Sequence, residues 1–189
     1  MVYVFLAEGF EEMEAITPVD VLRRVDIPAY LVSTVPGEKT VTGAHGIKIT
    51  ADFCFEEADF DACNMIVLPG GLPGATNLGA HEGLCEKIKE FAAAGEEAGK
   101  YVAAICAAPM VLGELGVLEG KMATIYPGME EELKGAIPMK NRVVVDGNII
   151  TSKGPGTAME FAVEIAGVLK DKLTMATLTF DLIMPKGLR

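Results

Sequence analysis

The feature that most constrains the fold is an alternation of short apolar runs with longer stretches of helical period. The apolar runs are rich in β-branched residues and lie at 2–7, 29–33, 65–71, 101–106, 122–126 and 148–152. The stretches of helical period lie at 11–24, 82–94, 109–115 and 157–170. Strands that alternate with helices are typical of a parallel sheet covered by helices on both faces. We therefore predict an α/β fold with a mostly parallel sheet.

Two segments depart from this alternation and predict antiparallel additions to the sheet. TVTGAHGIKITADF (40–53) has glycines around a pattern of period two, as in a hairpin. In RVVVDGNIITS (142–152), Asp146-Gly147 stands between two strands, which is a strong hairpin signal. The tail at 173–185 favours a helix that packs on the sheet or on a partner chain. Since no linker divides the chain, we expect one domain over 1–189.

The charge of the chain argues against several classes of partner. Asp and Glu total 27 against 16 Lys and Arg, a formal net charge of -11, which disfavours binding to nucleic acid and to anionic membranes. No run is long enough to span a bilayer, and the first residues resemble a core strand rather than a signal peptide. Four irregularly spaced cysteines and two histidines predict free thiols, no metal site and no cofactor. We expect a cytoplasmic location.

Cys106 ends a fully apolar strand and precedes Pro109, which suits the first turn of a helix. Ligands of open parallel sheets bind at the carboxyl ends of the strands. The helix dipole and free N–H groups there favour a thiolate and predict a lowered pKa for Cys106. The position is the thiol version of the nucleophile elbow of hydrolases. The alternative is a small buried hydrophobe.

The other three cysteines are interpreted as structural. Cys54 and Cys63 lie beside or within the acidic stretch FEEADFDAC, which disfavours a thiolate. Cys85 falls at a core position of the helix predicted at 82–94.

Two further segments can supply groups to the same edge of the sheet. Gly70 and Gly71 follow an apolar strand, and with the N–H of Ala107 they can form an oxyanion hole, although such a turn can also be only a tight turn. Glu14 lies on the inward side of the helix predicted at 11–24, with Phe10 and Val21. An inward carboxyl group near a thiol can be protonated and act as an acid or a base. The alternative is that these acids only complement the helix dipole.

Four motifs in order resemble the DJ-1/ThiJ/PfpI superfamily, and specifically its DJ-1 branch. They are EEMEAITPVDVLRR (11–24), IVLPGGLPGATNL (66–78), AAICAAPMVL (103–112) and ITSKGPGTAMEFA (150–162). The resemblance implies a flavodoxin-like α/β/α sandwich, a homodimer, a nucleophile-elbow cysteine at Cys106 and a protonated partner at Glu14. It also implies backbone donors at Gly70, Gly71 and Ala107, and a continuous, kinked helix across Pro18.

The sequence departs from related branches at three positions. The PfpI branch has a histidine directly after the cysteine, but this chain has Ala107, so the Cys-His dyad for proteolysis is missing. A glyoxalase-competent relative has a histidine where this chain has Tyr126, which is a poor base at neutral pH. His45 falls where relatives often carry an arginine, and it is either a cross-subunit contact to the pocket or a surface histidine. His81 is interpreted as a helix-start residue.

These observations leave two functions open. The first is a cysteine enzyme acting on small reactive aldehydes, of the glutathione-independent glyoxalase or deglycase type, with Cys106 as nucleophile and Glu14 as acid and base. The second is an oxidative-stress sensor or chaperone in which Cys106 is oxidised without turnover. A thiazole-phosphate biosynthetic role lacks support, because no phosphate loop or basic cluster accompanies the glycine turn. A pocket without turnover is also compatible with the loss of the histidine partner at Tyr126.

Overall fold

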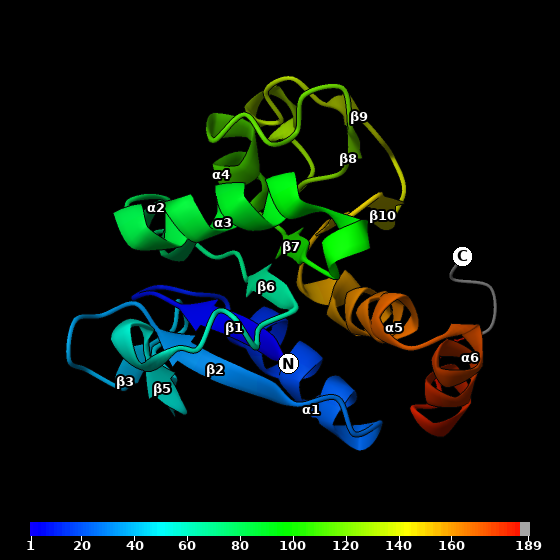
Figure 1. Ribbon diagram of the computed structural model, residues 1–189, viewed down its shortest axis with the longest axis horizontal. Coiled ribbons are helices and arrows are strands. Elements are labelled where there is room, and N and C mark those ends of the chain that lie inside the picture. Colours follow the sequence, from blue (N-terminus) through cyan, green and yellow to red (C-terminus); the bar gives the residue numbers. More distant parts are fainter. Residues whose placement is uncertain (186–189) are drawn as a thin grey trace.

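The computed structural model describes residues 1–185 and contains one seven-stranded sheet (Figure 1). The strand order is β10-β11-β7-β6-β1-β2-β5, and every pair of neighbours is parallel except β10 and β11. The strands are β1 (Val2–Leu6), β2 (Ala29–Ser33), β5 (Phe53–Cys54), β6 (Met65–Leu68), β7 (Tyr101–Ile105), β10 (Val143–Asp146) and β11 (Ile149–Ser152). The predicted α/β class with a mostly parallel sheet is confirmed.

Helices cover both faces of the sheet. One face carries α1 (Glu12–Arg24) and α5 (Ala158–Leu169), and the other carries α2 (Gly74–Gly79), α3 (Glu82–Ala94) and α4 (Pro109–Glu114) (Figure 1). Short 3₁₀ turns lie at Phe55–Glu57, Glu96–Ala98, Glu130–Glu132 and Pro155–Thr157. Within residues 1–185, each helix is either too short or too polar to cross a membrane.

Alternate residues of the strands supply two separate cores. In β1, Val4 and Leu6 pack with α1 and α5, whereas Tyr3 and Phe5 pack on the opposite face with α2, α3 and α4. This follows from the pleat, since successive side chains of a strand point to opposite faces. All five β1 residues are buried, which explains why the strand has a continuous apolar sequence.

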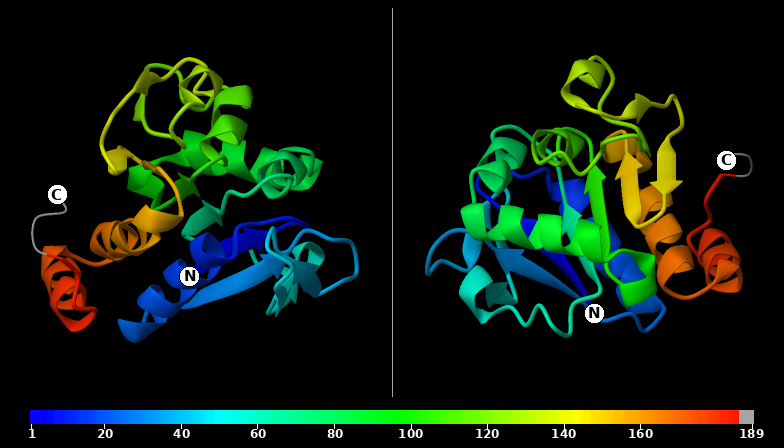
Figure 2. Two further views of the ribbon diagram at one scale, coloured as in Figure 1. Left: turned by 180° about the vertical axis from the view of Figure 1, so that it is seen from behind. Right: turned by 45° about the horizontal axis from the view of Figure 1, so that its top comes forward.

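Both predicted antiparallel additions are present. β3 (Thr40–Thr42) and β4 (Lys48–Thr50) pair with each other in a two-stranded sheet of their own. β10 and β11 pair across the turn that holds Gly147, whose φ is 59°. The tail forms α6 (Lys172–Asp181), which lies against α5 (Figure 2). The helical interpretation of 173–185 is therefore confirmed as far as Asp181.

The run 122–126 is not a strand of the main sheet, contrary to prediction. Only β8 (Met122–Ala123) is extended, and it pairs with β9 (Ile137–Pro138) in a separate sheet. The reason is that β7 and β10 already occupy both edges of β11. The N–H of Thr124 instead donates to Thr151 Oγ1 at 2.9 Å. The helix α2 was missed, because its six residues include a glycine at each end.

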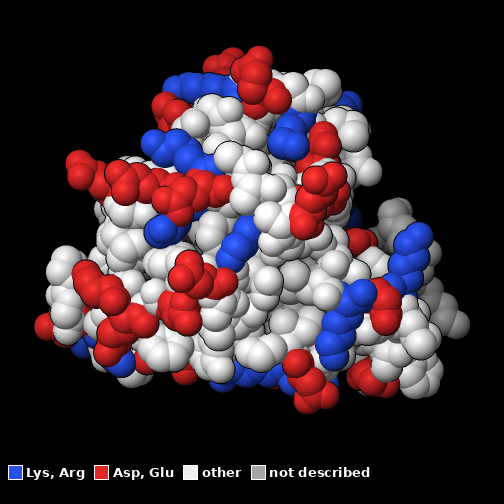
Figure 3. All heavy atoms as spheres, in the orientation of Figure 1, with Lys and Arg blue, Asp and Glu red and all other residues white. Residues whose placement is uncertain are grey.

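The surface reflects the acidic composition. In Figure 3, side chains of Asp and Glu form several groups over the visible face, with fewer Lys and Arg between them. Four of the seven ion pairs among residues 1–185 join side chains that are both more than one-third exposed, namely Arg23–Asp52, Arg24–Asp20, Lys39–Glu57 and Lys134–Glu114. Exposed pairs of this kind contribute little stability, so the fold depends mainly on its two apolar cores.

Candidate active site

Cys106 lies directly after β7 and three residues before Pro109, the first residue of α4. Its φ is 63°, a left-handed conformation that is rare outside glycine and costs about 1–2 kcal/mol. The N–H of Cys106 donates to Ser152 O at 3.0 Å, which holds the turn against the end of β11. The thiol is therefore held on a strained strand-to-helix turn, as the elbow interpretation predicts.

Glu14 lies in the first turn of α1 and has no exposed surface. Its Oε2 accepts a hydrogen bond from the N–H of Gly70 at 2.7 Å. Its Oε1 is the one buried side-chain nitrogen or oxygen within residues 1–185 that has no hydrogen-bond partner. Because an ionised oxygen without a donor is costly to bury, this atom is the natural place for a proton.

The carboxyl group of Glu14 and the thiol of Cys106 both lie beside Gly70. A β-carbon on Gly70 would stand 2.7 Å from Cys106 Cβ and 2.9 Å from Glu14 Oε2, so only glycine fits between them. The two side chains are close enough for each group to affect the pKa of the other. The predicted inward position of Glu14 is confirmed.

Burial is the main cause of the pKa shifts of both Glu14 and Cys106. It raises the pKa of Glu14 to about 7, assisted by the charge of Glu11, whereas the Gly70 N–H and the Cys106 thiol act in the opposite direction. Burial and the neighbouring Glu14 carboxylate raise the pKa of Cys106 to about 12, against the lowering effect of the Gly71 and Ala107 backbones. The predicted lowering of the Cys106 pKa is therefore wrong.

The three predicted backbone donors divide into two roles. The N–H of Gly70 is already used by Glu14, so it positions the carboxyl group rather than an oxyanion. The Gly71 and Ala107 backbones act on the Cys106 sulfur itself. Gly71 has φ 83°, and a β-carbon there would lie 2.6 Å from the backbone N of Glu11. Glycine is therefore required at this position by both conformation and space.

Tyr126 is part of the same site. Its N–H donates to Cys106 O at 2.9 Å, and its side chain is 47% exposed. A β-carbon on Gly154 would lie 3.3 Å from Tyr126 Cδ2 and 4.0 Å from Cys106 Sγ. Gly154 therefore forms a wall beside the sulfur. The sequence analysis did not assign this residue, although it lies in the GPG motif that follows the last predicted strand.

His45 is placed differently from the other predicted site residues. It lies between β3 and β4, its side chain is 67% exposed, and its Nδ1 is 2.7 Å from Glu12 Oε2. Ligand atoms of Glu11, Glu12 and His45 lie within 4.8 Å of one another. Glu12 accepts from His45, however, and Glu11 Oε2 accepts from the N–H of Glu14 at 2.8 Å. These groups form a hydrogen-bonded network within the protein.

The remaining cysteines and His81 lie away from this site. All four cysteines are free. Burial raises the pKa of Cys63 to about 11 and also raises the pKa of Cys85, which opposes a thiolate at either position. His81 caps α3 by accepting a hydrogen bond from the N–H of Leu84 at 3.1 Å, as predicted for a helix-start residue.

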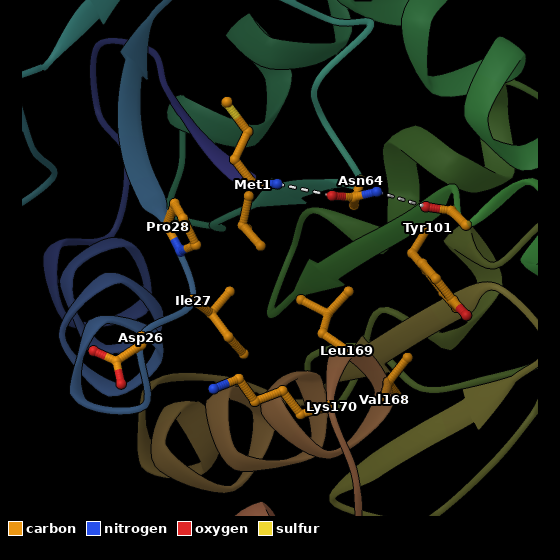
Figure 4. Close-up of a pocket in the computed structure, with 11 residues that line it drawn as sticks. Met1, Asp26, Ile27, Pro28, Asn64, Tyr101, Val168, Leu169 and Lys170 are labelled. Atoms are coloured by element: carbon orange, nitrogen blue, oxygen red, sulfur yellow. Dashed lines mark hydrogen bonds between the residues drawn. The ribbon is translucent and has the colours of Figure 1, made fainter.

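A cavity of about 430 Å³ lies at the opposite, amino-terminal edge of the sheet. Figure 4 shows Ile27 and Leu169 pointing into it, beside the N-terminus, where the amino group of Met1 donates to Asn64 Oδ1 at 2.8 Å. The starts of β1 and β7 line this cavity, whereas Cys106 follows the end of β7. It is therefore separate from the candidate active site.

A mostly parallel sheet with a strained strand-to-helix turn at a cysteine after a central strand defines a flavodoxin-like α/β protein. The model of the DJ-1/PfpI family matches residues 1–167. The chain belongs to this family.

Relatives and solved structures agree with this membership. The chain is 40% identical to protein dj-1beta of Drosophila melanogaster over 171 residues, 89% of each chain. It is 40% identical to protein DJ-1 homolog B of Arabidopsis thaliana over 87% of its length, but spans only 36% of that longer protein. The structure of Toxoplasma gondii DJ-1 in its oxidized form superposes with a TM-score of 0.89 at 32% identity, covering 96% of this chain and 97% of that one.

Proposed function

We propose that the protein is a cysteine-dependent enzyme acting on small reactive aldehydes, of the glutathione-independent glyoxalase or deglycase type. The observation that carries this proposal is a buried carboxyl group with a pKa of about 7, Glu14, beside the strained thiol of Cys106. A group that titrates near neutral pH can both give and accept a proton. A relative from Pyrococcus abyssi, 34% identical over 89% of this chain and 99% of its own, is named a deglycase.

The chemistry starts with attack of the Cys106 sulfur on the aldehyde carbon of an α-oxoaldehyde such as methylglyoxal. A C–S bond forms, and the carbonyl oxygen takes up the proton lost by the thiol. The backbone N–H groups of Gly71 and Ala107 beside the sulfur stabilise the negative charge on that oxygen. The product of this step is a hemithioacetal. Glu14 is protonated while the thiolate forms, and it then releases this proton to water, which its pKa of about 7 allows, so that it is a carboxylate for the next step.

Glu14 then moves a proton from the former aldehyde carbon to the neighbouring carbon through an enediol, which converts the hemithioacetal into a thioester. Water hydrolyses the thioester, releasing a 2-hydroxy acid and the free thiol. The sum is methylglyoxal plus water giving lactate, so neither an oxidant nor a cofactor is consumed. Attack on a glycated side chain by the same sulfur would be the deglycase variant.

Lactate release from methylglyoxal tests this function. The wild type is expected to form lactate, and Cys106→Ser is expected to lose at least about hundredfold in rate, because the hydroxyl group is a much weaker nucleophile. Glu14→Gln should lose activity as well. Cys85→Ser is the matched control, since Cys85 is also buried but lies on α3. Lactate formation at the wild-type rate in Cys106→Ser would falsify the proposed enzymatic function.

A second candidate, a sensor of oxidants, is favoured by the same donors around the sulfur. Two equivalents of peroxide convert a thiol to a sulfinate and two waters, and the N–H groups of Gly71 and Ala107 with a protonated Glu14 suit the new oxygens. Mass spectrometry after treatment with mild peroxide tests whether the protein is such a sensor. Selective addition of two oxygens at Cys106 supports the sensor, and equal oxidation of all four cysteines argues against it.

We also infer that two copies associate through the outer side of α1 and α5. These helices pack together, and they expose Met13 (54%), Ile16 (37%) and Met159 (38%). Exposed apolar side chains on neighbouring helices are typical of an interface between subunits. Sedimentation equilibrium should give a dimer that Ile16→Glu dissociates. Leu173→Glu on α6, where Leu173 is 75% exposed, is the control and should leave the dimer intact.

A further inference from the structure

Glu12 is the first residue of α1, and its side chain is only 8% exposed, yet it is not part of the Cys106 pair. His45, in the loop between β3 and β4, engages both of its oxygens. The His45 backbone N–H donates to Oε1 at 2.8 Å, and His45 Nδ1 lies 2.7 Å from Oε2. A buried carboxylate at the start of a helix is thus held by a histidine from a distant segment.

The backbone of the same loop covers this carboxylate. A β-carbon on Gly43 would lie 2.3 Å from Glu12 Oε1, so the loop can approach the side chain this closely only with glycine at that position. The N–H of Ala44 donates to Phe10 O at 2.8 Å, just before the helix. Since β3 and β4 pair with each other and with no further strand of residues 1–185, these contacts attach the hairpin to the start of α1.

The first turn of α1 also carries the candidate catalytic acid. Glu14 follows Glu12 by two residues, and its own N–H is capped by Glu11 Oε2 at 2.8 Å. The N–H of Glu11 in turn donates to Gly70 O at 3.0 Å, next to the Gly70 N–H that binds Glu14. The turn is therefore fixed to the Gly70 loop on one side and to the hairpin, through Glu12, on the other.

We propose that Glu12 is a positioning residue for the Cys106 site: its clamp on His45 and the loop at 43–47 holds the first turn of α1 so that the Glu14 carboxyl stays against the thiol. This inference rests on the proposed pairing of Glu14 with Cys106, but it does not depend on the substrate. Loss of the clamp lets the turn move. A catalytic carboxyl group displaced by about 1 Å from its productive position can cost up to a hundredfold in the rate of the catalysed reaction.

The charged groups around the clamp come from three segments. Glu11 lies on the same helix, His45 lies on the hairpin loop, and Glu8, after β1, accepts from the N–H of Thr42 at 3.3 Å. Burial alone would raise the pKa of Glu12, but the hydrogen bonds from the His45 side chain and backbone lower it overall, and the same pair raises the pKa of His45. At neutral pH Glu12 is therefore ionised, as the clamp requires.

The test is the pH profile of Cys106 alkylation by iodoacetamide, followed peptide by peptide with mass spectrometry. We expect Glu12→Gln and His45→Ala to move the midpoint of the profile to lower pH and to speed alkylation of Cys106 above pH 7 by about tenfold. The reason is that a displaced Glu14 carboxylate no longer raises the pKa of the thiol. Glu8→Gln is the matched control, because Glu8 is an exposed carboxylate that contacts the same hairpin.

The outcomes separate the possible failures. A lower melting temperature with an unchanged profile in both clamp variants would make Glu12 a structural residue only and overturn the inference. If Glu12→Gln does not fold, His45→Ala decides the question, because it removes the exposed partner and leaves the buried carboxylate in place. If Glu14→Gln itself leaves the profile unchanged, the pairing with Cys106 is wrong, and the proposed function fails together with the clamp.

Discussion

Glu14 stands beside Cys106 with one carboxyl oxygen bonded to the Gly70 N–H at 2.7 Å and the other without a partner among residues 1–185. A negative charge on Glu14 opposes a negative charge on the thiol, because the two groups share one buried site. The thiolate is therefore accessible only while Glu14 is protonated. The pKa of Glu14, about 7, makes this state well populated at neutral pH.

The raised pKa of Glu14 predicts a dependence of stability on pH. The native state holds this proton up to about pH 7, whereas the ordinary value is 4.5. The stabilising contribution is thus complete below pH 4.5 and is lost as the pH rises through 7. Gln has no such proton. The free energy of unfolding of Glu14→Gln, relative to wild type, should therefore increase between pH 4.5 and 8 by about 1–3 kcal/mol.

Urea unfolding of both proteins across this pH range measures the effect. Glu38→Gln, at an exposed position in the loop before β3, serves as the control and should show no comparable trend. A constant difference between Glu14→Gln and wild type from pH 4.5 to 8 would show that Glu14 titrates normally.

The close approach at Gly70 predicts a strong effect of one added methyl group. In Gly70→Ala the β-carbon would meet Cys106 Cβ at 2.7 Å, Ala107 N at 2.9 Å and Glu14 Oε2 at 2.9 Å. We expect a loss of about 1–3 kcal/mol in stability from overpacking, together with slower alkylation of Cys106. Gly156→Ala, in the nearby 3₁₀ turn, places its new carbon more than 4 Å from the other atoms of the described part of the chain and should change neither quantity measurably.

The ion pair between Arg142 and Glu160 should contribute more to the free energy of unfolding than a fully exposed ion pair does. Arg142 binds both oxygens of Glu160 at 2.8 Å and donates to Gly156 O at 2.7 Å, which ties β10 to α5 and to the loop beside the site. The Glu160 side chain is only 10% exposed. Glu160→Ala should cost about 1–3 kcal/mol in thermal or urea unfolding, because the guanidinium loses a largely buried partner.

The exposed pair of Arg24 with Asp20 on α1 is the comparison. Both of its side chains are more than half exposed, so Asp20→Ala should cost less than about 1 kcal/mol. If Glu160→Ala and Asp20→Ala lose the same free energy of unfolding, the contact of Glu160 with Arg142 stabilises the fold no more than an exposed pair does.

The sequence pattern predicted most of the fold because the buried strands and helices carry strong periodicity. The helix at 82–94 and the strand at 29–33 have the predicted bounds. The run at 122–126 misled the interpretation, since nothing in its apolar composition reveals that both edges of β11 are already occupied. Edge occupancy depends on contacts distant in sequence, which local patterns do not contain.

The positions of Cys106 and Glu14 in the fold were predictable from sequence, whereas their electrostatics were not. The position of Cys106 before Pro109 indicated the elbow, and the helical period placed Glu14 inward. The direction of the Cys106 pKa was wrong, because the helix dipole argument omits burial and a carboxylate that arrives from another segment. His45 was assigned to the pocket or the surface, whereas its partner is Glu12, which no local pattern identifies.

Tyr126 provides the last prediction, which rests on the proposed function. Its ring lies next to Gly154, which also stands beside the sulfur. A tyrosine hydroxyl can donate a hydrogen bond but is a poor base at neutral pH. Tyr126→His introduces a base with an ordinary pKa near about 6.5, and we expect it to raise kcat for lactate formation about tenfold or more. Tyr126→Phe keeps the ring without the hydroxyl, so it should show no gain. If His and Phe at this position give the same kcat, the missing imidazole does not limit the reaction, and Glu14 alone carries the proton.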